Sequence, residues 1–152
     1  MTKFQKLTVI LAACSLGAGI ASAEECSGVN ARVSEQPVVL HKTEDGTVTT
    51  FFDSTGASTL LTPAAHSNTG WQHCSGIMVT KADKSASGSG ICYRVALNGD
   101  QETVSWQFAG DDRTWKRESG TGSMGGAASG TWEWSALTGN VSIGAWKGDC
   151  EF

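Results

Sequence analysis

Residues 88–108 read GSGICYRVALNGDQETVSWQF and carry the clearest structural signal in the chain. Two runs of alternating side chains flank Asn98-Gly99, and this dipeptide is typical of a two-residue β-hairpin turn because both turn positions need positive φ. With a two-residue turn, Tyr93 lies opposite Val104. The pattern predicts an antiparallel hairpin whose apolar residues share one face, and we expect that face to be the core: Ile91, Tyr93, Val95, Val104, Trp106 and Phe108.

The segment before this hairpin is predicted to pair with it through two cysteines. An antiparallel register with Cys74 opposite Cys92 also places His73 opposite Tyr93, and strand neighbours lie about 4.5–5.5 Å apart, a separation that suits a disulfide. Alternation then puts one set of side chains on the core face, namely Ile77, Val79 and Ile91. It puts the disulfide on the opposite face, together with Met78 and Arg94.

The remaining chain consists of short alternating runs between turn signals, without the i, i+3, i+4 apolar spacing of a helix. The turn in residues 109–112 has two possible registers, and both place Trp115 on the face of Trp106. Asp45-Gly46 predicts a hairpin with apolar residues on both faces, which we expect the terminal segments to cover. Strands are expected near the N-terminus and over residues 37–43, 47–53, 58–62, 131–134 and 140–147, with a glycine-rich loop at 119–129.

About eight antiparallel strands result from this assignment. Eight such strands close into a barrel whose interior is filled by side chains or holds one small ligand. We therefore expect an all-β fold in the form of a small antiparallel barrel of about eight strands. A two-sheet β-sandwich is the alternative.

The first 23 residues have the features of an export signal. Lys3 and Lys6 precede an apolar stretch, and Ala21-Ser22-Ala23 forms an A-x-A cleavage site. We expect residues 1–23 to be a signal peptide and residues 24–152 to form a single barrel domain that is secreted or periplasmic.

A second interpretation of the N-terminus is a lipobox, Leu11-Ala12-Ala13-Cys14, at which bacterial lipoproteins are cut and acylated on cysteine. We favour simple secretion over a lipid anchor at Cys14 because the apolar region before this cysteine is short for a signal segment. No other stretch approaches the ~18 apolar residues of a membrane helix, so we expect no membrane span.

Four cysteines follow the expected cleavage site: Cys26, Cys74, Cys92 and Cys150. An even number of cysteines behind an export signal indicates two disulfides formed in an oxidising compartment. Three pairings are possible. We favour Cys74 with Cys92, which the strand register supports, and therefore Cys26 with Cys150.

The charge of the chain argues against one class of partner. Residues 24–152 carry 9 basic and 15 acidic side chains, a net charge of −6. This sign repels phosphate backbones, so we expect no nucleic-acid partner.

Glycines, tryptophans and cysteines recur at set spacings over residues 74–148. The motifs are CSG (74–76), GSGIC (88–92), GD (99–100), WQF (106–108), GTG (120–122), GG (125–126), SGTW (129–132) and WKG (146–148). This series resembles secreted bacterial proteins with an allene oxide cyclase-like barrel, most of them uncharacterised. The resemblance implies an eight-stranded barrel with a Gly-Thr-Gly loop before a late strand. It does not extend to the active-site carboxylate of the plant cyclases, so the cyclase reaction is not implied.

Five residues on the expected inner face are candidates for ligand binding: His73, Tyr93, Glu102, Trp106 and Trp115. Aromatic walls suit a flat apolar ligand, and a few polar groups orient it. His73 and Cys74 do not form a metal set with His66, because adjacent strand residues point to opposite faces. The sequence contains no nucleophile elbow, phosphate-binding loop or CxxC motif, so we expect no catalytic set, metal or cofactor.

We therefore expect an exported, non-enzymatic barrel that binds a small apolar ligand. The first alternative is an isomerase or cyclase type of enzyme, which would need His73, Tyr93 and Glu102 to converge inside the barrel. The second alternative is a structural or interaction protein of the cell envelope.

Overall fold

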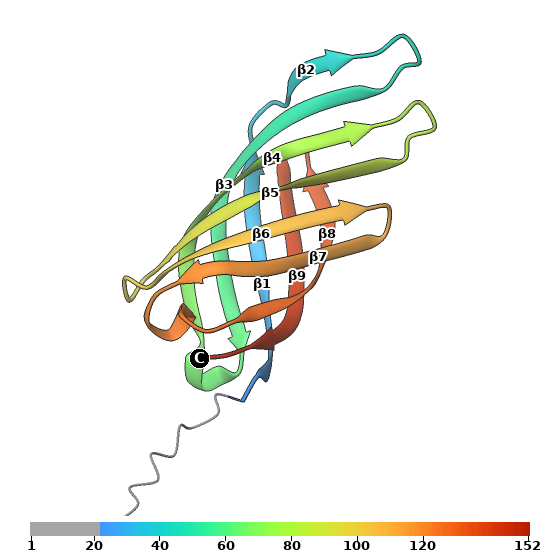
Figure 1. Ribbon diagram of the computed structural model, residues 1–152. Coiled ribbons are helices and arrows are strands. Elements are labelled where there is room, and N and C mark those ends of the chain that lie inside the picture. Colours follow the sequence, from blue (N-terminus) through green and yellow to red (C-terminus); the bar gives the residue numbers. More distant parts are fainter. Residues whose placement is uncertain (1–21) are drawn as a thin grey trace, which may run out of the picture.

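The computed structural model describes residues 22–152 and shows a β-barrel (Figure 1). Residues 1–21, which hold most of the expected signal peptide and Cys14, lie outside the described part of the chain. The described elements are β1 (Glu24–Ser34), β2 (Val38–Lys42), β3 (Val48–Thr62), η1 (Ala64–His66), β4 (Asn68–Thr80), β5 (Ala86–Ala96), β6 (Gln101–Ala109), β7 (Asp112–Gly120), η2 (Gly122–Met124), β8 (Ala128–Thr138) and β9 (Val141–Cys150), where η marks a 3-10 helix.

Eight of these strands form the barrel. They pair antiparallel in the order β1-β9-β8-β7-β6-β5-β4-β3, and the pairing of β1 with β3 closes the ring. β2 lies outside the ring, paired with the first residues of β3. The predicted all-β class and eight-stranded antiparallel barrel are confirmed, and the barrel that the resemblance implies is the fold observed.

β3 is one strand of 15 residues where the sequence predicted two. Residues 48–51 pair with β2, and residues 54–62 pair with β1 along the same edge. β1 therefore closes the barrel, and the prediction that terminal segments cover the β2–β3 hairpin is wrong. β2 is exposed along its whole length.

The β5–β6 turn has three residues, not the predicted two. The amide of Gly99 donates to the carbonyl oxygen of Ala96 (2.9 Å), and the φ of Gly99 is 90°, which is the geometry of a type I turn followed by a left-handed residue. Arg94 consequently pairs with Glu102. Because side chains alternate along a strand, this one-residue shift reverses the faces of β5.

The reversal corrects the predicted core. Ile91 and Tyr93 lie on the outer face, 54% and 40% exposed, while Cys92 and Arg94 are buried inside. The predicted register of β4 with β5 is confirmed, including Cys74 opposite Cys92 and His73 opposite Tyr93. Since that register is fixed, β4 is reversed as well: Ile77 faces outward, and the Cys74–Cys92 disulfide lies inside the barrel.

The strands that follow have the predicted faces. Ala109 pairs with Asp112, so the β6–β7 turn takes one of the two expected registers and sets Trp106 opposite Trp115. Val104, Trp106, Phe108 and Trp115 all line the interior.

The two ends of the barrel differ. The β2–β3, β4–β5, β6–β7 and β8–β9 turns lie at one end, the hairpin end (Figure 1). At the other, the closed end, the β7–β8 connection folds inward and buries Met124 almost completely. Asp100 holds this connection, because its carboxylate accepts hydrogen bonds from the amide (3.0 Å) and hydroxyl (2.7 Å) of Ser123. The Cys26–Cys150 disulfide joins β1 to β9 at the closed end.

Two facing glycines make room for Trp106. Gly76 and Gly90 lie opposite each other on β4 and β5, and the indole of Trp106 covers both. A Cβ atom at Gly90 would lie 2.1 Å from the carbonyl oxygen of Ser75 and 2.4 Å from Cζ2 of Trp106. Only glycine permits this close approach of strand to strand and of ring to strand.

Gly90→Ala is therefore expected to destabilise the protein by about 1–3 kcal/mol, the usual cost of overpacking a core. Urea unfolding of the oxidised protein measures the change. Ser89→Ala, on the exposed face of the same strand, is the matched control and should leave the midpoint in place. Equal midpoints for the two variants would contradict the packing described.

Acidification is expected to loosen the closed end. Hydrogen bonds from Ser123 lower the pKa of Asp100 below its ordinary value of 3.8. Ionised Asp100 therefore contributes its full stabilisation at pH values above its ordinary pKa of 3.8. This contribution is lost as the pH falls through the lowered pKa of the folded state. Hydrogen exchange, corrected for its intrinsic pH dependence, should show weaker protection of the Ser123 amide at about pH 2 than at about pH 5.

The Trp106 amide in the core is the internal reference for this measurement. In Asp100→Ala the Ser123 amide should be poorly protected at both pH values. Unchanged protection in that variant would show that Asp100 does not hold the connection.

Candidate functional site

The barrel encloses a cavity of about 360 Å³. This volume lies within the range of small-molecule sites, about 300–1,000 Å³. Seven aromatic side chains line it: Phe52, Trp106, Phe108, Trp115, Trp132, Trp134 and Trp146.

Trp132 is the centre of the aromatic wall. Its ring meets Trp106, Phe108 and Trp134 edge to face, with centroid separations of 6.4, 6.1 and 6.4 Å. Its indole N–H donates to the carbonyl oxygen of Thr114 at 3.1 Å. The packing and the hydrogen bond fix the ring, so this part of the wall is preorganised.

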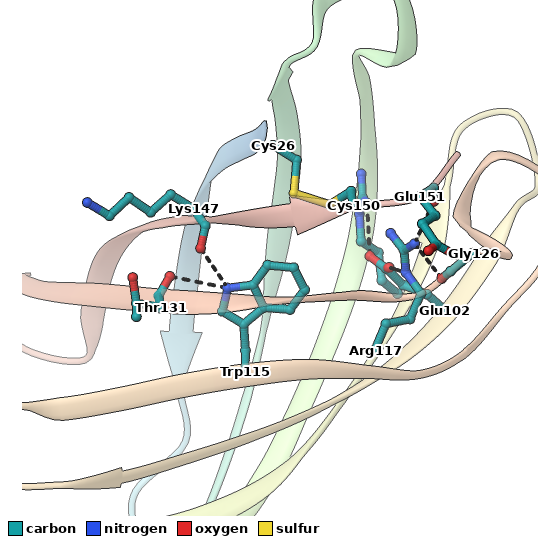
Figure 2. Close-up of a disulfide and its surroundings, with 10 residues drawn as sticks. Cys26, Glu102, Trp115, Arg117, Gly126, Thr131, Lys147, Cys150 and Glu151 are labelled. Carbon is teal, nitrogen blue, oxygen red and sulfur yellow. Dashed lines mark hydrogen bonds and ion pairs between the residues drawn. A yellow bond between two sulfur atoms is a disulfide. The ribbon is translucent and has the colours of Figure 1, made fainter. Parts of the chain in front are cut away.

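Trp115 is fixed in a similar way nearer the closed end. Its indole N–H points between β8 and β9 and is shared by the carbonyl oxygens of Thr131 and Lys147, both at 3.2 Å (Figure 2). The ring packs edge to face against Trp146, with centroids 5.5 Å apart. The polar atom of Trp115 is thus bound to backbone, and its carbon surface contributes to the cavity.

A buried group of three charges fills the cavity floor at the closed end. Glu102 accepts from Nη1 of Arg94 at 3.1 Å and from Nε of Arg117 at 2.8 Å, and all three side chains are at most 9% exposed. Arg117 also donates to the carbonyl oxygen of Gly126 at 2.9 Å (Figure 2). Arg94 donates to the thioether sulfur of Met124 at 3.2 Å. The group ties β5, β6 and β7 to the connection that closes this end.

Arg32 lines the same cavity from β1 but has neutral partners. In the amide orientation that satisfies its hydrogen bonds, Gln72 accepts from Nε and Nη2 of Arg32 at 2.6 and 2.8 Å, and Asn30 accepts from Nη2 at 3.2 Å. The guanidinium lies over the ring of Trp134, 5.0 Å from its centroid. Burial lowers the pKa of Arg32 to about 10, so the side chain stays charged at neutral pH.

Arg113 occupies a comparable position on β7. Its guanidinium lies over the ring of Trp132, 5.5 Å from the centroid. Among the described residues, neither Arg113 nor Arg32 forms an ion pair with a carboxylate. The four arginines of the chain all line the cavity, whereas none of the lysines within residues 22–152 does.

The structure divides the five predicted ligand-binding residues into two groups. Glu102, Trp106 and Trp115 line the cavity. His73 and Tyr93 lie on the outer face, because the β5–β6 turn reverses both strands. His73 contacts Asp53 (Nε2 to Oδ1, 2.5 Å), and the Tyr93 hydroxyl donates to Gln101 at 2.7 Å. The prediction that His73 and Tyr93 join Glu102 inside the barrel is therefore wrong.

The sequence prediction missed the arginines of the cavity. For Arg113 and Arg117 a signal was present, since each lies two residues from Trp115 and strand residues of that spacing share a face. To place Arg94 inside the barrel, the prediction would have needed the length of the β5–β6 turn. Arg32 gave no signal, because its strand neighbours Ala31 and Val33 are apolar and suggest the opposite inward face.

The described residues contain no group of three or more His, Cys, Asp or Glu side chains placed to hold a metal ion. No helix within residues 22–152 has the length and apolar character required to cross a membrane. Comparison of the chain with protein families, curated proteins and solved structures gives no match.

Replacing Glu102 is expected to destabilise the protein strongly. Glu102→Gln leaves Arg94 and Arg117 buried without a countercharge, and breaking a buried ion pair from one side costs about 3–5 kcal/mol. The free energy of unfolding, from urea titration, measures this. Glu118→Gln removes a carboxylate from the exposed pair with Lys116 and should change stability little. Similar losses in both variants would contradict a special role of the buried group.

Proposed function

We propose that this protein binds a small molecule with a flat apolar body inside the barrel. The observation that carries the proposal is the cavity of about 360 Å³ with its wall of seven aromatic side chains. Aromatic side chains in fixed positions recognise flat apolar surfaces through offset and edge-to-face packing. Concave, mostly apolar pockets with a few polar groups are the usual form of small-molecule sites.

The ligand enters from the hairpin end in this proposal. Met124, the charged group around Glu102 and the Cys26–Cys150 disulfide occupy the closed end. Towards the hairpin end the lining continues through Met78 and Pro37, where the β1–β2 connection borders the opening of the barrel.

Binding takes place outside the cytoplasm in this proposal. The Cys26–Cys150 and Cys74–Cys92 disulfides fit an oxidising compartment, and disulfides are rare in reducing ones. The basic, apolar and A-x-A segments of residues 1–23 support export as the route.

Binding is proposed in preference to catalysis because of the partners that the polar candidates have. Glu102 is held between two arginines, so each of its carboxylate oxygens already accepts a hydrogen bond from a guanidinium. His73 and Tyr93 contact solvent on the outer face. An acid and a base that converge on the lumen are the requirement for the cyclase alternative.

Titration of the oxidised protein with the neutral dye N-phenyl-1-naphthylamine tests the proposal. Dye fluorescence should rise and saturate at one dye per barrel, because the dye has a flat apolar body. Trp134→Ala removes part of the cavity wall and should weaken binding about two- to ten-fold. Trp71→Ala, which removes a half-exposed tryptophan from the outer face, is the matched control and should leave the affinity unchanged.

Two results would refute binding in the barrel. One is the absence of saturable binding by the wild-type protein. The other is equal weakening by Trp134→Ala and Trp71→Ala, which would locate the dye on the outer surface. Native mass spectrometry of the exported protein gives an independent reading of any ligand that purifies with it.

A further inference from the structure

We propose that the ligand of the barrel is an organic anion, with a carboxylate or sulfonate group that lies against Arg32 and an apolar body along the aromatic wall. This inference rests on the proposed function, since it assigns a charge to the molecule bound in the same cavity. Its foundation is the set of arginines, which an uncharged apolar ligand does not require.

Arg32 is a cation whose donors are only partly used. Its Nε–H and Nη2–H groups are engaged by the side-chain oxygens of Gln72 and Asn30. Among the described residues these bonds use Nε and Nη2, and none uses the two protons on Nη1. The guanidinium is therefore held rigidly on one side by neutral amides and retains donors on the other.

Arg32 is partly buried, and removing a cation from much of its water without a countercharge is unfavourable. Desolvation lowers the pKa of Arg32. A nearby carboxylate would raise this pKa again, but no carboxylate within residues 22–152 forms an ion pair with Arg32. Elsewhere in the same cavity the chain does supply a countercharge, because Glu102 neutralises one of its two arginine partners. The uncompensated charge at Arg32 is accounted for if the ligand brings the negative group.

The cavity as a whole is positive although the chain is acidic. Four arginines line it, and Glu102 is the carboxylate that points inward. Glu133, the other acidic residue of the lining, is exposed and alternates with Trp132 and Trp134, so its carboxylate lies on the outer face. The interior therefore carries a formal charge of about +3, inside a chain whose net charge is −4.

The arrangement of cations and rings also fits both parts of such a ligand. Arg32 lies over Trp134 and Arg113 lies over Trp132, two positions along the same face of β8. Each positive group is thus directly beside an aromatic surface. Guanidinium groups bind carboxylates and related oxyanions through paired N–H donors, which makes arginine better suited than lysine to this task.

A matched pair of dyes tests the charge of the ligand. N-phenyl-1-naphthylamine is neutral, and 8-anilinonaphthalene-1-sulfonate has the same ring system with an added sulfonate. The wild-type protein should bind the anionic dye about ten- to a hundred-fold more tightly, the range expected for a charge-assisted hydrogen bond in a protected site. 2-Naphthoate should displace the anionic dye, and uncharged 2-naphthylmethanol should displace it poorly.

Arg32→Gln should abolish most of this preference, so that the affinity for the anionic dye falls about ten-fold further than the affinity for the neutral dye. Lys147→Gln removes the same charge from the exposed face and is the matched control, which should keep the preference. Arg32→Met serves the same purpose if the glutamine variant does not fold. A fluorescence titration and a melting curve of each variant separate lost binding from lost structure.

The outcomes distinguish the two proposals. Binding of neither dye in the barrel refutes the proposed function and this inference together. Equal affinity of the wild-type protein for both dyes leaves the proposed function standing and overturns the anionic ligand. Equal loss of both dyes in a folded Arg32 variant, or equal loss of preference in Lys147→Gln, likewise overturns the assignment to Arg32.

Discussion

The ion pairs of Glu102 with Arg94 and Arg117 are the interaction on which the closed end of the barrel depends. They link three consecutive strands and reach the connection that carries Met124. The pairing of Arg94 with Glu102 exists in one register only, the one set by the three-residue turn at Gly99. A shift of one residue would move Arg94 to solvent and leave Glu102 with a single partner. Buried charge therefore specifies the register more strongly than the apolar residues of β5 do.

The sequence predicted the architecture well because strand alternation, turn chemistry and cysteine count agree on it. Barrel class, β4–β5 register and both disulfides follow from these signals. The inward face of β5 could not be obtained in the same way. A period of two is compatible with either face, and Asn98-Gly99 indicates a turn without giving its length. Hydrophobicity then favoured Ile91 and Tyr93, which lie outside.

The candidate site was predictable in part for a related reason. Trp106 and Trp115 were placed correctly, and Arg117 follows from Trp115 by alternation. β1 and β5 cannot be assigned by hydrophobicity, because they are inverted: Val29 and Ile91 are exposed, whereas Asn30 and Arg94 are buried. A barrel that only needed a stable core would place apolar residues inward on every strand. Inward polar residues on β1 and β5 are what the proposed ligand site would require.

The Cys26–Cys150 disulfide connects the first and last barrel strands, and its two Cα atoms are 5.8 Å apart. Both ends of the described chain therefore leave the molecule on one side, opposite the hairpins (Figure 1). A tether, carrier or fusion partner joined to either terminus would therefore lie beside the closed end, away from the hairpin end where ligand entry is proposed (Figure 1). The disulfide also joins the chain covalently between β1 and β9. A proteolytic cut in one hairpin would therefore leave the two fragments linked, and the β1–β9 pairing would be held in place.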